Sequence, residues 1–260
     1  MSTDTPLNTA TDHEGHAKSA RWLRFLPRWS LAAGLFTIAL PITILGAIGF
    51  KATDSALGAD YIELLQAVRT PAMFRLGWTI DAIIWLLIGG SLLILGGILQ
   101  DRAPIAGTFV CVSGVAQLIG FLGALIRLFG TTDLAVAYTS AAPDQQLTIL
   151  NSYLNMWRII SSHFYAAVLF SGLGYLIAAQ NFISLRGFPR WLAIWLALPG
   201  CLGLAQFFIV SFGLPKLDIL NYIGVGLGNI ALNFAIAGAL WRPSSELIST
   251  VSGEIQNDFS

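Results

Sequence analysis

One aspartate lies inside a long apolar stretch, where an ionised carboxylate is unfavourable. Asp81 belongs to Phe74–Leu99, a stretch longer than the roughly 20 apolar residues that a helix needs to cross a bilayer. At the helical rise, the carboxyl group lies about 10 Å into this span. An isolated charge there costs at least about 2.5 kcal/mol on insertion scales. We therefore expect Asp81 to be paired with another side chain or to be protonated.

Two interpretations of Asp81 follow from this position. It either makes a polar contact that holds helices together, or it belongs to a proton or ligand site. His163 is expected at a similar depth on a later span. Arg75, Arg127 and Arg158 are expected at the rim, from which an arginine reaches water or bends toward a carboxylate. We expect Asp81 to pair with Arg127 or His163.

Amide side chains are the second group of polar residues in apolar stretches. Gln117 belongs to a row of small and polar residues at helical spacing, which predicts a face packed against protein: Ser113, Gln117, Gly120, Ala124 and Arg127. Asn229 and Asn233 are four residues apart, so they share one helix face. The sequence thus predicts either a sealed polar network or a cavity in one half of the bundle, lined by Asp81, Gln117, Arg127, Arg158, His163, Asn229 and Asn233.

Several chemistries lack the residues that they need, so the sequence favours a protein that is not an enzyme and has no cofactor or metal. A retinal Schiff base is excluded, because it needs a lysine within a span and all lysines lie outside the predicted spans. One histidine in the spans does not supply the two ligands of a bis-histidine haem. There is no paired metal-ligand motif, glycine-rich phosphate loop or nucleophile elbow. Ser162 is adjacent to His163, and adjacent residues point to different sides of a helix.

Composition places these residues in a membrane protein. The chain is 55% apolar and 11% charged, whereas soluble domains have about 25% charged residues. With no net charge it has no footprint for nucleic acid, and its predicted partners are the lipid bilayer and a small or lipid-like ligand. We predict an all-α transmembrane bundle of about six spans, near residues 30–50, 74–99, 105–129, 153–178, 191–212 and 219–240.

This domain, residues 29–242, is flanked by two predicted tails. Residues 1–28 form a disordered tail with a basic segment before the first span, and residues 243–260 form a polar, loose tail. Residues 51–70 and 130–146 are longer loops, and the first contains a short surface helix. Basic residues are more frequent on the side of both termini, which the positive-inside rule assigns to the cytoplasm.

A faint internal repeat relates two predicted hairpins. Arg75 and Gly89 correspond to Arg158 and Gly172 at a constant offset, and Gln117 resembles Gln206 in the following span. A duplicated helical hairpin would explain these matches, as in some transporters. Chance similarity between apolar segments is the alternative.

Three motifs resemble an uncharacterised bacterial family of six-span membrane proteins, known as a domain of unknown function. They are Pro71 to Asp81 with Phe74-Arg75 and Gly77-Trp78, the stretch from Asn155 to His163, and Phe188 to Leu192. The resemblance implies six helices in a bacterial inner membrane and supplies no activity. The leading functional hypothesis is a non-enzymatic protein that binds or moves a small or lipid-like molecule, or acts as a membrane partner. A proton-coupled transporter that uses Asp81 comes second, and an intramembrane hydrolase third.

Overall fold

The chain is all-helical in the computed structural model, which describes residues 9–48, 71–212 and 215–252. The long helices are α1 (Thr9–Ile48), α4 (Pro71–Leu99), α5 (Pro104–Ile126), α7 (Pro143–Phe182), α8 (Arg190–Ser211) and α9 (Pro215–Leu240). Three short helices complete the described part: η2 (Arg127–Thr131), α6 (Thr132–Ser140) and α10 (Ser245–Val251). The predicted all-α class is therefore confirmed. The surface helix predicted within residues 51–70 lies outside the described residues.

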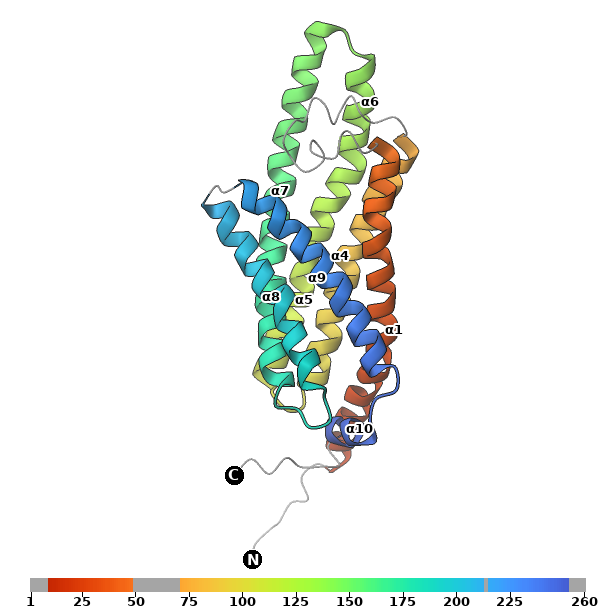
Figure 1. Cartoon of the computed structure of the whole chain (residues 1–260), viewed down its shortest axis with the longest axis vertical. Coiled ribbons are helices and arrows are strands. Elements are labelled where there is room, and N and C mark those ends of the chain that lie inside the picture. Colours follow the sequence, from red (N-terminus) through yellow and green to blue (C-terminus); the bar gives the residue numbers. More distant parts are fainter. Residues whose placement is uncertain (1–8, 49–70, 213–214, 253–260) are drawn as a thin grey trace, which may run out of the picture.

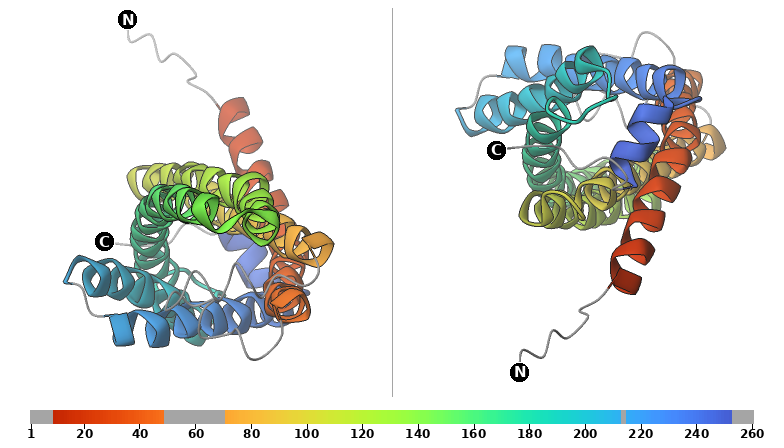
Figure 2. Two further views of the ribbon diagram at one scale, coloured as in Figure 1. Left: turned by 90° about the horizontal axis from the view of Figure 1, so that it is seen from above. Right: turned by 90° about the horizontal axis from the view of Figure 1, so that it is seen from below.

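The long helices form a ring in chain order. Each packs against the next, α9 returns to α1, and α4 also touches α7 (Figure 2). Five of the helices are long and apolar enough to cross a membrane, and the described part of α9 together with α10 raises the number to six. The first described turns of α1 lie at the same end of the bundle as α10 (Figure 1). We call this end the α10 end.

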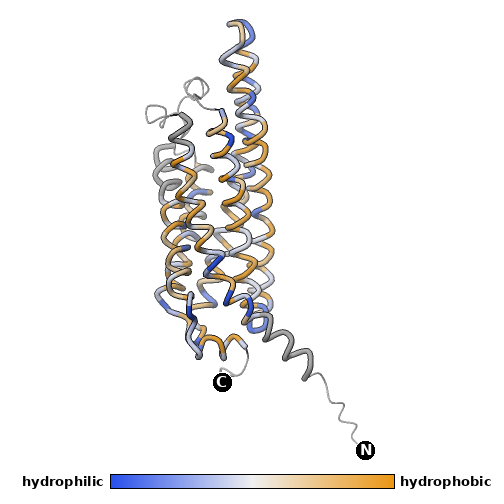
Figure 3. Tube along the Cα trace, turned by 90° about the vertical axis from the view of Figure 1, so that its right-hand side faces the viewer, coloured by the Kyte–Doolittle hydropathy of each residue, from blue (hydrophilic) through white to orange (hydrophobic). Residues whose placement is uncertain are grey.

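The segment predicted as a loop at residues 130–146 is mostly helical, so that prediction was wrong. Helix α5 continues through η2 into α6, and α7 begins at Pro143. Buried Ala135, Tyr138 and Tyr153 pack with Phe74 and form an apolar cluster that holds the two helices together. With 40 residues, α7 is about 60 Å long, twice the roughly 30 Å hydrocarbon core. The hairpin of α6 and α7 therefore projects beyond the other helices, and hydrophilic residues lie at its tip (Figures 1 and 3).

Both predicted tails contain helix where a loose chain was expected. Helix α1 already begins at Thr9. Helix α10 forms because the Ser244 hydroxyl caps it by accepting a hydrogen bond from the Leu247 amide at 3.1 Å. Leu247 and Val251 are buried against the bundle. The Leu247 backbone lies so close to Gly187, which has a φ of 74°, that a β-carbon there would be 2.6 Å from the Leu247 nitrogen. Two apolar residues at helical spacing thus order this polar segment.

Glycines set the close approach of the first helices. A β-carbon on Gly89 or Gly96 would lie 2.8 Å from a carbonyl oxygen of α5, so backbone meets backbone there. Gly90 faces α1 instead, where the Trp29 ring fills the space and its indole donates a hydrogen bond to the Leu87 carbonyl at 2.7 Å. The glycines of α4 therefore serve packing within the chain.

The second hairpin has a comparable crossing. A β-carbon on Gly172 of α7 would lie 3.0 Å from the Gly200 carbonyl oxygen of α8, and the reverse distance is also 3.0 Å. Gly172 is the residue that the internal repeat matches to Gly89. Both hairpins thus cross at glycines, in agreement with the predicted duplication, which stays a prediction.

The main apolar core lies at the α10 end. It includes Phe182 and Phe188, whose rings are 4.6 Å apart, and buried leucines from most helices. Along α8 the buried apolar side chains of this core stop at Leu196, and along α9 they start at Leu232. Further from the α10 end, the buried positions described on these two helices are Pro199, Gly200, Gly203, Gln206, Gly228 and Asn229. The interior between α8 and α9 is therefore apolar at the α10 end, and further from that end its buried positions include glycines and the amide side chains of Gln206 and Asn229.

Candidate functional site

Asp81 of α4 pairs with Arg127, the first residue of the π-helical turn η2. The Arg127 Nη1 atom donates to the Asp81 Oδ2 atom at 3.4 Å, and the residues are 6% and 5% exposed. Of the two partners predicted for Asp81, the structure has Arg127. The pair is electrically neutral as a unit, which resolves the problem of a lone carboxylate within the span.

Aromatic rings enclose the Arg127 guanidinium group. Its central carbon lies 4.3 Å from the ring centroids of Trp78 and Phe164 and 5.0 Å from that of Trp157. A guanidinium over an aromatic face gains about 0.5–2 kcal/mol per contact, with the larger values for desolvated groups. The three rings come from α4 and α7, so Arg127 connects three helices. We call Arg127, Trp78, Trp157 and Phe164 the arginine cage.

Trp85 fixes the carboxylate side of the pair. Its indole donates a hydrogen bond to Asp81, one helical turn away on α4, and its ring stacks on Phe164 at 5.2 Å. The ring occupies a notch at Gly120, where a β-carbon would lie 2.4 Å from it. A glycine on α5 therefore positions the donor that binds Asp81.

The π-helical turn η2 begins at Arg127, which continues the buried face of α5. Such turns occur mostly as single insertions in α-helices and often lie at functional sites. The Thr131 hydroxyl donates to the Arg127 carbonyl at 2.5 Å within this turn. Arg127 is buried while Phe129, two residues later, is 69% exposed. The predicted face of α5 is confirmed, because all five of its residues are buried: Ser113, Gln117, Gly120, Ala124 and Arg127.

The cage contains hydrogen-bond donors that have no acceptor. Arg127 Nε and Trp78 Nε1 are buried and have no hydrogen-bond partner within the described part of the chain; Thr132 Oγ1, outside the cage and one residue after η2, is also buried without one. More than nine in ten buried polar groups in proteins have a partner, and an exception points to water, an ion or a ligand. Since Asp81 already balances the charge of Arg127, the free donors favour a neutral acceptor as well as an anionic one.

Gln117 lies about 15 Å from Arg127 along α5 by helical rise. Its amide nitrogen donates to the Ala167 carbonyl of α7 at 3.0 Å and to the Ser113 carbonyl at 3.1 Å. Its Oε1 atom is buried without a partner among the described residues. Gln117 therefore holds α5 to α7 below the cage.

The other predicted site residues do not join the Asp81 pair. The His163 Nδ1 atom lies 2.7 Å from the Ile159 carbonyl; because a carbonyl only accepts, Nδ1 is the donor. Arg158 is exposed. Asn229 and Asn233 each donate to a carbonyl of their own helix, at 2.9 and 2.8 Å. Helix α9 packs against α1 and α8, so the single predicted cavity is separated into different places.

The aromatic members of the site were not predicted from sequence. Trp78 and Trp85 are three and four residues from Asp81, which places all three on one helix face. Trp157 and Phe164 are seven residues apart on α7, another same-face spacing. These spacings were the available signal. No group of histidine, cysteine, aspartate or glutamate that could hold a metal occurs in the described ranges.

Comparison with known proteins gives no match to a family, to a curated protein or to a solved structure.

Proposed function

We propose that this chain is a six-span, non-enzymatic membrane protein that binds or moves a small or lipid-like molecule. The observation that carries the proposal is the pair of buried donors without acceptors in the cage, at Arg127 and Trp78. A ligand whose polar head offers acceptors, such as a carbonyl, ester or carboxylate group, satisfies them. Its apolar part then contacts the aromatic rings, of which Trp157 and Phe164 are half-buried.

We further propose that the α10 end faces the cytoplasm of a bacterial inner membrane. Successive long helices alternate in direction around the ring, which supports an even number of spans. Most arginines of the described helices and turns lie toward the α10 end, as the positive-inside rule requires of the cytoplasmic side: Arg21, Arg24, Arg28, Arg102, Arg186, Arg190 and Arg242. The bacterial setting rests on the sequence resemblance. The arginine cage then lies in the outer half of the membrane.

The test replaces the buried pair by apolar residues of similar volume, because such replacements are often neutral or stabilising, whereas removal of one partner is not. Native mass spectrometry of the wild-type protein should show a bound molecule of constant mass, which the double variant Asp81→Leu/Arg127→Met loses. The matched control is Arg75→Met/Asp133→Leu, which removes an exposed ion pair of the same residue types. If the wild type carries no bound molecule, or the double variant retains it, the proposal is wrong.

A proton-coupled transporter is the second candidate, because the contact between Asp81 and Arg127 is long for an ion pair, at 3.4 Å. In proteoliposomes, Asp81→Asn should then remove the pH dependence of transport. The hydrolase hypothesis has less support. The Ser162 hydroxyl lies 3.5 Å from His163 Nδ1, but it donates to the Ile159 carbonyl at 2.7 Å. Nδ1 donates to the same carbonyl, so it is not free to accept the serine proton.

A further inference from the structure

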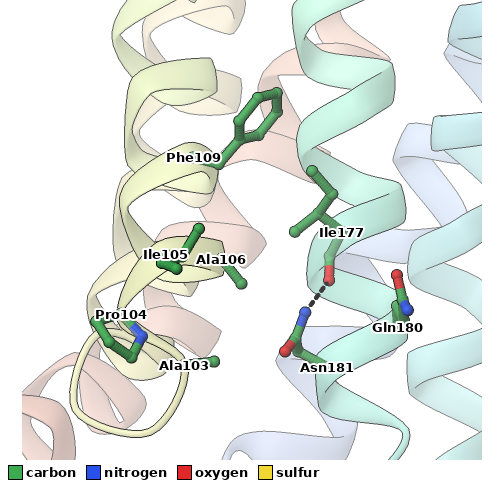
Figure 4. A pocket seen from close by; sticks show the side chains of 8 residues that line it. All are labelled: Ala103, Pro104, Ile105, Ala106, Phe109, Ile177, Gln180 and Asn181. Carbon is green, nitrogen blue, oxygen red and sulfur yellow. Dashed lines mark hydrogen bonds between the residues drawn. The ribbon is translucent and has the colours of Figure 1, made fainter.

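A groove lies on the outside of the ring between the start of α5 and the end of α7. The groove has a cavity volume of about 470 Å³. Figure 4 shows the side chains that line it: Ala103, Pro104, Ile105, Ala106, Phe109, Ile177, Gln180 and Asn181. Six of these side chains are apolar, and Ile105 is 88% exposed. The groove is at the α10 end, far along α5 from the arginine cage. It therefore faces the bilayer near one membrane surface.

The polar groups of the groove lie on one side of it. Asn181 donates to the Ile177 carbonyl at 2.8 Å, so part of its amide is already used within α7. Gln180 is exposed. Opposite them, α5 begins with Pro104 at its first turn, and Ala103 has no side chain that caps the helix. The groove thus combines an apolar wall with a polar rim, formed by Gln180 and Asn181, on the side nearer the α10 end.

The segments that adjoin the lining in the sequence are mainly basic. Arg102 directly precedes the lining and is half-buried. Partial burial lowers the pKa of Arg102 while Asp101 raises it, and an arginine stays protonated in proteins. Arg186 and Arg190 lie in and after the turn from α7 to α8, whose residues 183–190 include no acidic side chain. The chain segments that continue from the lining therefore carry more positive than negative charge, which favours an anionic partner.

We propose that this groove binds an anionic phospholipid, with one acyl chain along Ile105, Phe109 and Ile177 and the phosphate group at Arg102. An acyl chain fits the apolar wall, which a soluble anion would leave unused. Arg102 distinguishes an anionic from a zwitterionic headgroup, since Lys and Arg near a membrane surface attract anionic lipids. The site is separate from the arginine cage, so it does not depend on the proposed function.

Native mass spectrometry of the full chain, with phosphatidylglycerol and phosphatidylcholine added at equal concentration, tests the proposal. The wild type should retain phosphatidylglycerol about tenfold better, the ratio expected for a charged hydrogen bond to phosphate. Arg102→Gln should remove this preference. Ala106→Trp fills the groove and should reduce the first bound lipid of either type, whereas Leu118→Trp, a change at an exposed position of α5 outside the groove, should not.

Three results would overturn the proposal. The first is equal retention of both lipids by the wild type. The second is an unchanged preference in Arg102→Gln, which is outside the lining and decides the question even if Ala106→Trp does not fold. The third is displacement of the lipid by inorganic phosphate, since that would indicate a site for a free anion.

Discussion

The two ends of the membrane domain have different interiors. At the α10 end, apolar side chains such as Phe182, Leu92 and Leu192 are fully buried and pack into one core. At the opposite end, a buried ion pair lies among aromatic rings and buried donors lack acceptors. Unpartnered polar atoms also occur between the ends, and Thr250 at the α10 end is an exception to the division.

This difference separates a part that stabilises the fold from a part that is compatible with binding. Apolar burial stabilises by about 25 cal/mol per Å², whereas a buried ion pair is often no more stable than apolar residues in its place. In a membrane, moreover, helix association depends on packing and polar contacts rather than on a hydrophobic driving force between helices. An incompletely satisfied polar cluster is therefore better explained by a ligand than by stability.

The largest expected effect is on the apolar end. Phe182→Ala should lower the free energy of unfolding by about 4 kcal/mol, because it leaves a cavity in a fully buried site beside Phe188. Reversible denaturation in detergent measures this. Ile183→Ala, at a position 43% exposed, should change stability by less than about 1 kcal/mol. Equal effects of the two variants would show that the core does not stabilise this end.

Removal of one charge from the buried pair should have the next effect. Asp81→Asn leaves Arg127 buried without a counter-charge and should cost about 3 kcal/mol. The control is Asp133→Asn, because Asp133 pairs with Arg75 at 2.5 Å with side chains 67% and 56% exposed. An exposed pair contributes about 0–1 kcal/mol. A similar loss for both variants in the same unfolding assay would mean that burial of the Asp81 pair has no energetic consequence.

Glycine packing should have a smaller effect. Gly114→Ala places a β-carbon 2.8 Å from the Gly89 carbonyl oxygen, so α4 and α5 must separate, at a cost of about 2 kcal/mol. Gly226→Ala meets nothing within 4 Å and should be neutral or slightly stabilising, since alanine is the better helix former. Thermal unfolding of the two variants side by side provides the measurement. A destabilised Gly226→Ala would contradict the packing described for α9.

The sequence predicted the helical class, the buried face of α5 and a partner for Asp81, because each depends on spacing along one helix or on the cost of a charge in lipid. It left Arg127 and His163 as alternative partners, and the structure has Arg127. It did not predict the course of residues 130–146, since the polar composition there gives no sign of the contact between Tyr138 and Tyr153. The separation of Asn229 from the cage was also not predictable, because it depends on which helices are neighbours in the ring.

The smallest expected effect concerns α10. Ser244→Ala removes the hydroxyl that accepts from the Leu247 amide and should cost about 1 kcal/mol. Ser249→Ala changes a serine that only donates to its own helix and should have less effect. Limited proteolysis at the C-terminus and thermal unfolding report both. If Ser249→Ala were the more damaging change, capping would not be what orders this helix.

We expect the buried donors of the arginine cage to bind an acceptor that the chain does not provide. The decisive measurement is an experimental density map of the purified protein that resolves ordered waters. It should show density outside the protein within hydrogen-bonding distance of Arg127 Nε and Trp78 Nε1. A map in which both atoms donate to side chains or carbonyls of the chain, with no additional density among the rings, would contradict this expectation.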